Sequence, residues 1–181
     1  DQARDKILLG IERTGVVLTD SELRDIAYHE AGHALVAAFL PNTDPVQKVT
    51  IVPRSQSLGV TQQMPERDKY LYGRNYLRSR LAVMMGGRAA EVLKNNEITS
   101  GAENDLKQAT SLARRMVLDF GMSDELRHLA FGSERRHVFL GEELGQAKEY
   151  SEETARKIDE EVGAILSEAF QTAHDTLEEH E

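Results

Sequence analysis

Apolar residues recur at intervals of three and four positions along most of this 181-residue chain, as they do in amphipathic helices. Helices are predicted over residues 19–40, 68–94, 100–120 and from 151 onward. Two shorter stretches have the composition of strands and are bounded by turn residues. Strands are predicted over residues 46–52 and 58–64, with a further short strand around 138–140. Together these elements predict a mainly α-helical domain with a small β-sheet, in the α+β class.

Local signals mark several ends of these helices. Two segments have the spacing of a capping box, Thr19-x-x-Glu22 and Ser100-x-x-Glu103. Pro41 and Gly121 follow two of the predicted ends. The apolar stripes of the last two helices are Ala102, Leu106, Ala109, Ala113, Met116 and Phe120, and Ile158, Val162, Ile165, Ala169 and Ala173. Inside the second helix, Gly86-Gly87 costs helix stability and therefore predicts a break or a close helix contact.

The composition restricts the chemistry that the chain can carry. There is no cysteine, which excludes a disulfide framework, an iron–sulfur cluster and a thiol nucleophile. Any bound metal must therefore be held by His, Asp or Glu. The longest apolar run, residues 34–40, is far shorter than the roughly 20 residues of a membrane span, and the first residues are charged, unlike a signal peptide. We expect the chain by itself to be soluble.

Charge is concentrated near the C-terminal end. Residues 142–181 contain 13 acidic and 3 basic residues, which accounts for the net charge of −9. We interpret this segment as a solvated helix face. The remainder is close to neutral and has no basic patch, so nucleic acid is not expected as a partner.

One motif points to specific chemistry. His29-Glu30-Ala31-Gly32-His33 lies within the first predicted helix, where positions four apart share one face. Two imidazoles on that face can bind one zinc ion, and the glutamate beside them can take a proton from zinc-bound water. Gly32 would let another backbone approach this helix, either for the site or as a plain packing contact.

A catalytic zinc site needs a third protein ligand. No third histidine follows at the spacing His-x-x-Gly-x-x-His. The remaining candidates are Asp105, Glu91, Asp119, His128 and His137. Asp105 is favoured over Glu91 because it borders an apolar helix stripe, although an aspartate in a first turn is also explained by the helix dipole.

Several blocks, in this order, make the chain similar to the FtsH-type AAA metalloproteases. They are His29-Glu30-Ala31-Gly32-His33, Lys48-Val49-Thr50-Ile51-Val52-Pro53-Arg54, Leu58-Gly59-Val60-Thr61, Met85-Gly86-Gly87-Arg88-Ala89-Ala90-Glu91 and Thr99-Ser100-Gly101-Ala102-Glu103-Asn104-Asp105-Leu106. The resemblance covers nearly the whole chain and concerns the C-terminal protease domain of that family.

The resemblance implies a zinc endopeptidase with a zincin-like metal helix and one Zn²⁺ per chain. It assigns the metal ligands to His29, His33 and Asp105 and the general base to Glu30. Glu91 then orients a ligand without binding the metal. Zinc-bound water, activated by Glu30, would attack the peptide bond.

The resemblance also implies a larger protein. Residues 1–18 are expected to form a linker leaving an ATPase module, and residues 19–181 the protease domain, with 146–181 as its acidic helical end. ATP would act only through that module, because the chain has no phosphate-binding Gly-x-x-x-x-Gly-Lys motif. The full-length protein would be a homohexamer anchored in a membrane, with this domain on the cytoplasmic side. The bacterial inner membrane is expected first, and an organellar membrane is the alternative.

In that family the substrates are unfolded or tagged membrane and soluble proteins. Two other functions stay open from the residues. One is a stand-alone zinc peptidase without an ATPase partner, and the other is a ring component without catalytic activity. Because His29, Glu30, His33 and Asp105 are all present, the processive zinc endopeptidase is the preferred interpretation.

Overall fold

The computed structural model describes residues 12, 15–54, 57–65, 67–126, 128–130 and 150–180. Its elements are α2 (Asp20–Phe39), β1 (Val46–Thr50), β2 (Val60–Gln63), α3 (Arg74–Asn95), η1 (Ser100–Ala102), α4 (Glu103–Leu118) and α5 (Glu152–Glu179). The predicted mainly helical α+β class is thereby confirmed. The strand predicted around 138–140 lies outside the described residues. None of the described helices is long and apolar enough to cross a membrane.

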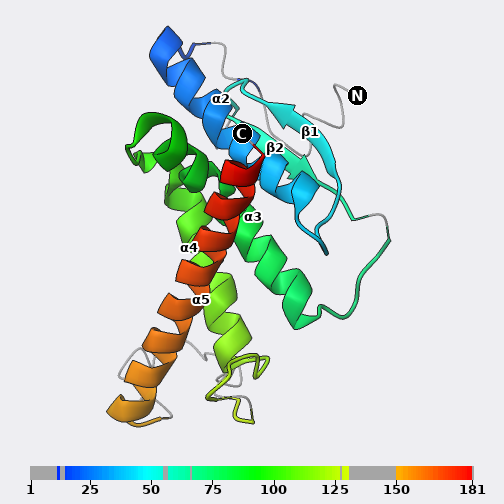
Figure 1. Cartoon of the computed structure of the whole chain (residues 1–181), viewed down its shortest axis with the longest axis vertical. Helices are drawn as coiled ribbons and strands as arrows, with labels where there is room; N and C mark the ends of the chain where they lie inside the picture. Colours follow the sequence, from blue (N-terminus) through cyan, green and yellow to red (C-terminus); the bar gives the residue numbers. More distant parts are fainter. Residues whose placement is uncertain are drawn as a thin grey trace, which may run out of the picture.

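Four α-helices, the short 3₁₀ turn η1 and one β-hairpin are the regular elements of the described part of the chain (Figure 1). The antiparallel hairpin β1–β2 lies beside α2, and α3 packs against α2. The long helix α5 runs along α3 and α4, and its C-terminal end returns to α2. There the ring of His180 stacks on Phe39 with 3.7 Å between the ring centroids. The sheet, α3 and the end of α5 therefore all contact α2.

The predicted start of α2 is confirmed in detail. Thr19 Oγ1 accepts a hydrogen bond from the Glu22 backbone N–H, while Glu22 Oε2 accepts one from the Thr19 backbone N–H. These are the two reciprocal bonds of a capping box. The helix ends at Phe39, and Leu40 caps it immediately before Pro41. Both ends of the helix that carries the histidine motif are therefore determined by local residues.

The predicted start of α3 is wrong by six residues. The helix begins at Arg74, with Gly73 as its N-cap residue, rather than near Asp68. Tyr70 and Leu71 are 87% and 93% exposed, so no buried surface stabilises a helix there. The apolar positions of this segment fit the helical spacing without being covered by another element.

The Ser100 capping box is also wrong. Thr99, not Ser100, is the cap: its side chain accepts a hydrogen bond from the Gly101 N–H and opens the 3₁₀ turn η1, which leads into α4. Helix α4 ends at Leu118, and Phe120 is 41% exposed beyond it. Gly121 has a positive φ of 59°, as expected for a stop residue.

The hydrophobic core is centred on α3, which packs against α2, α4 and α5. Every residue predicted for the α5 stripe is buried, and so are Ala109, Ala113 and Met116 of the α4 stripe. The largest fully buried apolar side chains are Leu81, Met116, Ile158, Val36 and Val117. These residues come from all four described helices, so the core holds the helices of the site in fixed positions.

A glycine contact joins α2 to α3. A Cβ on Gly32 would collide with the Gly86 carbonyl oxygen and lie 2.7 Å from the Ala90 Cβ. A Cβ on Gly86 would in turn lie 2.8 Å from the Gly32 carbonyl oxygen. Gly87 makes room for the His29 ring, whose Nδ1 would be 2.6 Å from an added Cβ. Of the two outcomes predicted for Gly86-Gly87, the close helix contact is the one observed, and α3 continues without a break.

Replacing Gly32 by Ala is expected to lower the free energy of unfolding by roughly 1–3 kcal/mol, because the helices must separate to admit the methyl group. The matched control is Gly163→Ala in α5, where nothing lies within 4 Å of an added Cβ. That change should stabilise the protein by about 1 kcal/mol through helix propensity. Urea unfolding followed by circular dichroism measures both, and equal effects would contradict the close-contact interpretation.

Candidate metal centre

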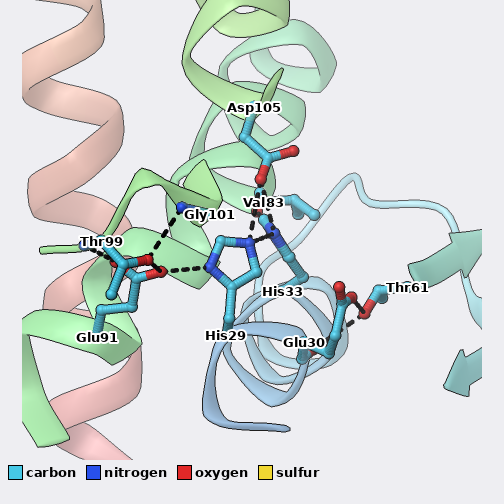
Figure 2. A network of polar contacts seen from close by, with 9 residues as sticks. All are labelled: His29, Glu30, His33, Thr61, Val83, Glu91, Thr99, Gly101 and Asp105. Carbon is cyan, nitrogen blue, oxygen red and sulfur yellow. Dashed lines mark hydrogen bonds and ion pairs between the residues drawn. The ribbon is translucent and has the colours of Figure 1, made fainter. Parts of the chain in front are cut away.

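His29 and His33 lie on one face of α2, one turn apart (Figure 2). Their ring centroids are 4.7 Å apart, and the two Nε2 atoms are separated by 3.1 Å. Both residues are at most 9% exposed. The spacing of the motif therefore brings two imidazole nitrogens to one point beneath α4.

Asp105 reaches the same point from the first turn of α4. Its Oδ2 lies 3.2 Å from His29 Nε2 and 3.3 Å from His33 Nε2. A tetrahedral ion with donor atoms at about 2.0–2.1 Å requires those atoms to be about 3.3 Å from one another. The separations of 3.1, 3.2 and 3.3 Å therefore match the three edges of one face of such a tetrahedron.

The other ring nitrogens show which atoms face this point. His33 Nδ1 lies 2.6 Å from the Val83 carbonyl oxygen, which can only accept, so this nitrogen carries hydrogen. His29 Nδ1 lies 2.8 Å from Glu91 Oε1 and donates in the same way. In neutral rings both Nε2 atoms then carry lone pairs. With both rings neutral, two lone pairs and a carboxylate oxygen would meet with no hydrogen between them, and all three atoms could then bind one cation.

The close approach of these groups also shifts the pKa values of Asp105 and His29. Burial alone would raise the pKa of Asp105, but its hydrogen bonds with His29 and His33 hold that pKa well below the usual range. Burial alone would lower the pKa of His29, but Asp105 and Glu91 raise it above the ordinary value. The two carboxylates thus favour positive charge at His29, which is the charge that a bound cation would also supply.

Glu91 lies behind His29 and not at the converging atoms. It is 2% exposed, and it accepts hydrogen bonds from the Thr99 backbone N–H at 2.9 Å and from Thr99 Oγ1 at 3.0 Å. With its bond to His29 Nδ1, this fixes the ring in one orientation. Among the candidates for a third ligand, Asp119 and His128 are exposed and take no part in this cluster, and His137 is outside the described residues.

Glu30 is the acidic residue of the histidine motif. It is 6% exposed and faces the start of β2, where Thr61 donates a hydrogen bond of 2.7 Å to its Oε2. Burial raises the pKa of Glu30, and the bond from Thr61 and the nearby histidines offset part of that rise. A carboxylate with a raised pKa beside a cation site is suited to accept a proton near neutral pH.

Three contributors to this site were not predicted. They are the Thr61 hydroxyl, the Thr99 side chain and the Val83 carbonyl group. Thr99 could have been found, because threonine is also a favoured N-cap residue. The other two have no sequence signal, since any residue has a carbonyl group and threonine is ordinary in a strand.

A histidine pair and a glutamate on one helix, with a carboxylate from a second helix, form the arrangement expected at the metal site of a metallopeptidase. The model of peptidase family M41 matches residues 16–181, and the chain belongs to this family.

Curated relatives match along essentially the whole chain. It is 58% identical over 180 residues to the ATP-dependent zinc metalloprotease FtsH 2 of Salinibacter ruber, covering 99% of this chain and 26% of that protein. FtsH 4 of Sphaerobacter thermophilus is 53% identical over 99% of the chain and 27% of its own length. FtsH of Acidobacterium capsulatum is 46% identical over 100% of the chain and 28% of its own length. The chain therefore spans about a quarter of these relatives.

Proposed function

We propose that this chain is the zinc-dependent endopeptidase part of an ATP-dependent protease, with His29, His33 and Asp105 holding one Zn²⁺ ion and Glu30 acting as the general base. The observation that carries the proposal is the convergence of the three acceptor atoms within 3.3 Å of one another, with Glu30 on the adjoining helix position. The donor set of two nitrogens and one oxygen is one that zinc accepts.

Different residues of the chain have different roles in the proposed peptide hydrolysis. When bound, zinc supplies a Lewis acid that lowers the pKa of water and polarises the substrate carbonyl group. Glu30 accepts the proton of the attacking water and passes it to the leaving amine. Glu91 holds His29 with Nδ1 protonated, and the Val83 carbonyl group does the same for His33.

Strand β2 offers a way to bind an extended polypeptide. Within the described part of the chain it pairs with β1 alone, so its other edge has no strand partner. The same strand carries Thr61, which contacts Glu30. A polypeptide paired with this edge by main-chain hydrogen bonds would run past the cation site in a largely sequence-independent manner. Such binding suits unfolded substrates.

The relatives support the wider proposal. Their names describe ATP-dependent zinc metalloproteases, and this chain spans about a quarter of their length. We infer that an ATPase module outside residues 19–181, joined through residues 1–18, delivers unfolded or tagged polypeptides to this domain. The proposed whole protein is a membrane-anchored homohexamer with this domain on the cytoplasmic side.

Removal of the metal tests the function directly. Protein treated with a chelator and then dialysed is expected to lose hydrolysis of a fluorogenic peptide and of an unfolded protein. Addition of about one Zn²⁺ per chain should restore both activities, while circular dichroism shows that the helices persist throughout. Undiminished hydrolysis by protein shown to contain no metal would overturn the proposal.

A further inference from the structure

The beginning of β2 lies directly against the Glu30 side chain. Thr61 Oγ1 is 2.7 Å from Glu30 Oε2 and 3.0 Å from the Glu30 backbone carbonyl oxygen (Figure 2). Because the hydroxyl has one proton and both neighbours are acceptors, it can donate to only one of them at a time. The shorter distance and the charge of the carboxylate favour Oε2.

Gly59 closes the other side of the same carboxylate. A Cβ at this position would lie 2.7 Å from both Glu30 Cγ and Oε1, and 3.0 Å from Cδ. The three atoms nearest to such a Cβ all belong to Glu30, so the lack of a side chain at position 59 leaves room for this residue. Glu30 therefore occupies a slot bounded by the backbone at Gly59 and the hydroxyl of Thr61.

This slot limits the positions that the base can take. A glutamate side chain has three rotatable bonds, and ordering them at the moment of reaction would raise the barrier. In the described chain the side-chain hydrogen bond of Glu30 goes to Oε2. Oε1 is then the oxygen left to accept a proton from water.

We propose that Thr61 and Gly59 are positioning residues for the Glu30 base. This proposal rests on the proposed function, in which Glu30 is the general base. The Thr61 hydroxyl holds Glu30 Oε2 by a hydrogen bond, and Gly59, which has no side chain, leaves room for Glu30 Oε1. Thr61 lies in β2, the strand that would pair with substrate, and Gly59 directly precedes this strand, so one segment would align both the base and the polypeptide.

The kinetic test compares Thr61→Val, which removes the hydroxyl at similar size, with Thr61→Ser, which keeps it. In zinc-loaded whole chain acting on a short peptide, Thr61→Val should lower kcat by roughly 10–100-fold with KM within about twofold. Thr61→Ser should recover most of the loss. Gly59→Ala should also lower kcat, because the methyl group displaces Glu30. All variants should retain about one zinc per chain by elemental analysis.

The matched control is Thr50→Val in β1, whose hydroxyl accepts from the Val52 N–H and contacts no part of Glu30. It should leave kcat unchanged. An unchanged kcat in Thr61→Val would overturn the proposal, and so would equal losses in the Val and Ser variants accompanied by loss of zinc.

A second measurement needs no activity. In chelator-treated protein, Thr61→Val should lower the unfolding midpoint by roughly 2–4 °C in the parent but much less in a Glu30→Ala background. Additive shifts would overturn the Thr61–Glu30 interaction. Failure of the parent chain to cleave peptide would contradict the proposed function. The comparison of Thr61→Val in the two backgrounds would still show whether Thr61 and Glu30 interact.

Discussion

Replacing Glu30 by Gln should reduce kcat for peptide hydrolysis by about 10²–10⁴-fold, the usual contribution of a general base. An amide keeps the size of the side chain and can still accept the hydrogen bond from Thr61 through its oxygen, but it cannot take up a proton at neutral pH. Because Glu30 is not among the converging metal-binding atoms, the variant should keep about one zinc per chain. Steady-state kinetics and elemental analysis on the same preparation measure both quantities.

The control for this experiment is Glu160→Gln on the exposed face of α5, which makes the same chemical change outside the cluster of His29, His33 and Asp105. It should have the activity of the parent. A Glu30→Gln protein that cleaves at the parental rate would show that Glu30 is not the base. Loss of zinc in that variant would instead place Glu30 among the residues that hold the metal.

Asp105→Ala should largely abolish zinc binding. The change removes the one anionic atom that lies within 3.3 Å of both Nε2 atoms and leaves only two neutral nitrogens. Glu91→Gln, tested beside it, alters a residue that only orients His29 and should weaken zinc binding by roughly 10–100-fold. A competition titration against a chromophoric chelator gives the affinities, and elemental analysis gives the zinc content after dialysis. The loss in Asp105→Ala should be the larger.

The comparison of these two variants decides between the two leading candidates for the third ligand. Tight binding of one zinc by Asp105→Ala, together with loss of zinc in Glu91→Gln, would assign the ligand to Glu91. Circular dichroism serves as the folding control, because Asp105 lies outside the hydrophobic core and its replacement leaves the buried α3–α5 contacts intact.

Local patterns predicted most of the described elements. The start of α2 was predictable because Thr19 and Glu22 satisfy each other's backbone groups within a single turn. The buried face of α5 was predictable because helical periodicity places its apolar residues together whatever they pack against. The same reasoning extended α3 too far, because spacing alone does not reveal that Tyr70 and Leu71 have nothing to cover them.

The sequence by itself determined that His29 and His33 share one face of a helix with Glu30 beside them, because four residues make about one helical turn. Only the tertiary structure decided which acidic residue meets the histidines. Asp105 and Glu91 are 76 and 62 positions from His29, and they reach opposite sides of its ring. Their places depend on how α3 and α4 pack on α2, including the contact of Gly32 with Gly86. Helical spacing is a local property of the chain, whereas such distances are determined by the packing of several helices at once.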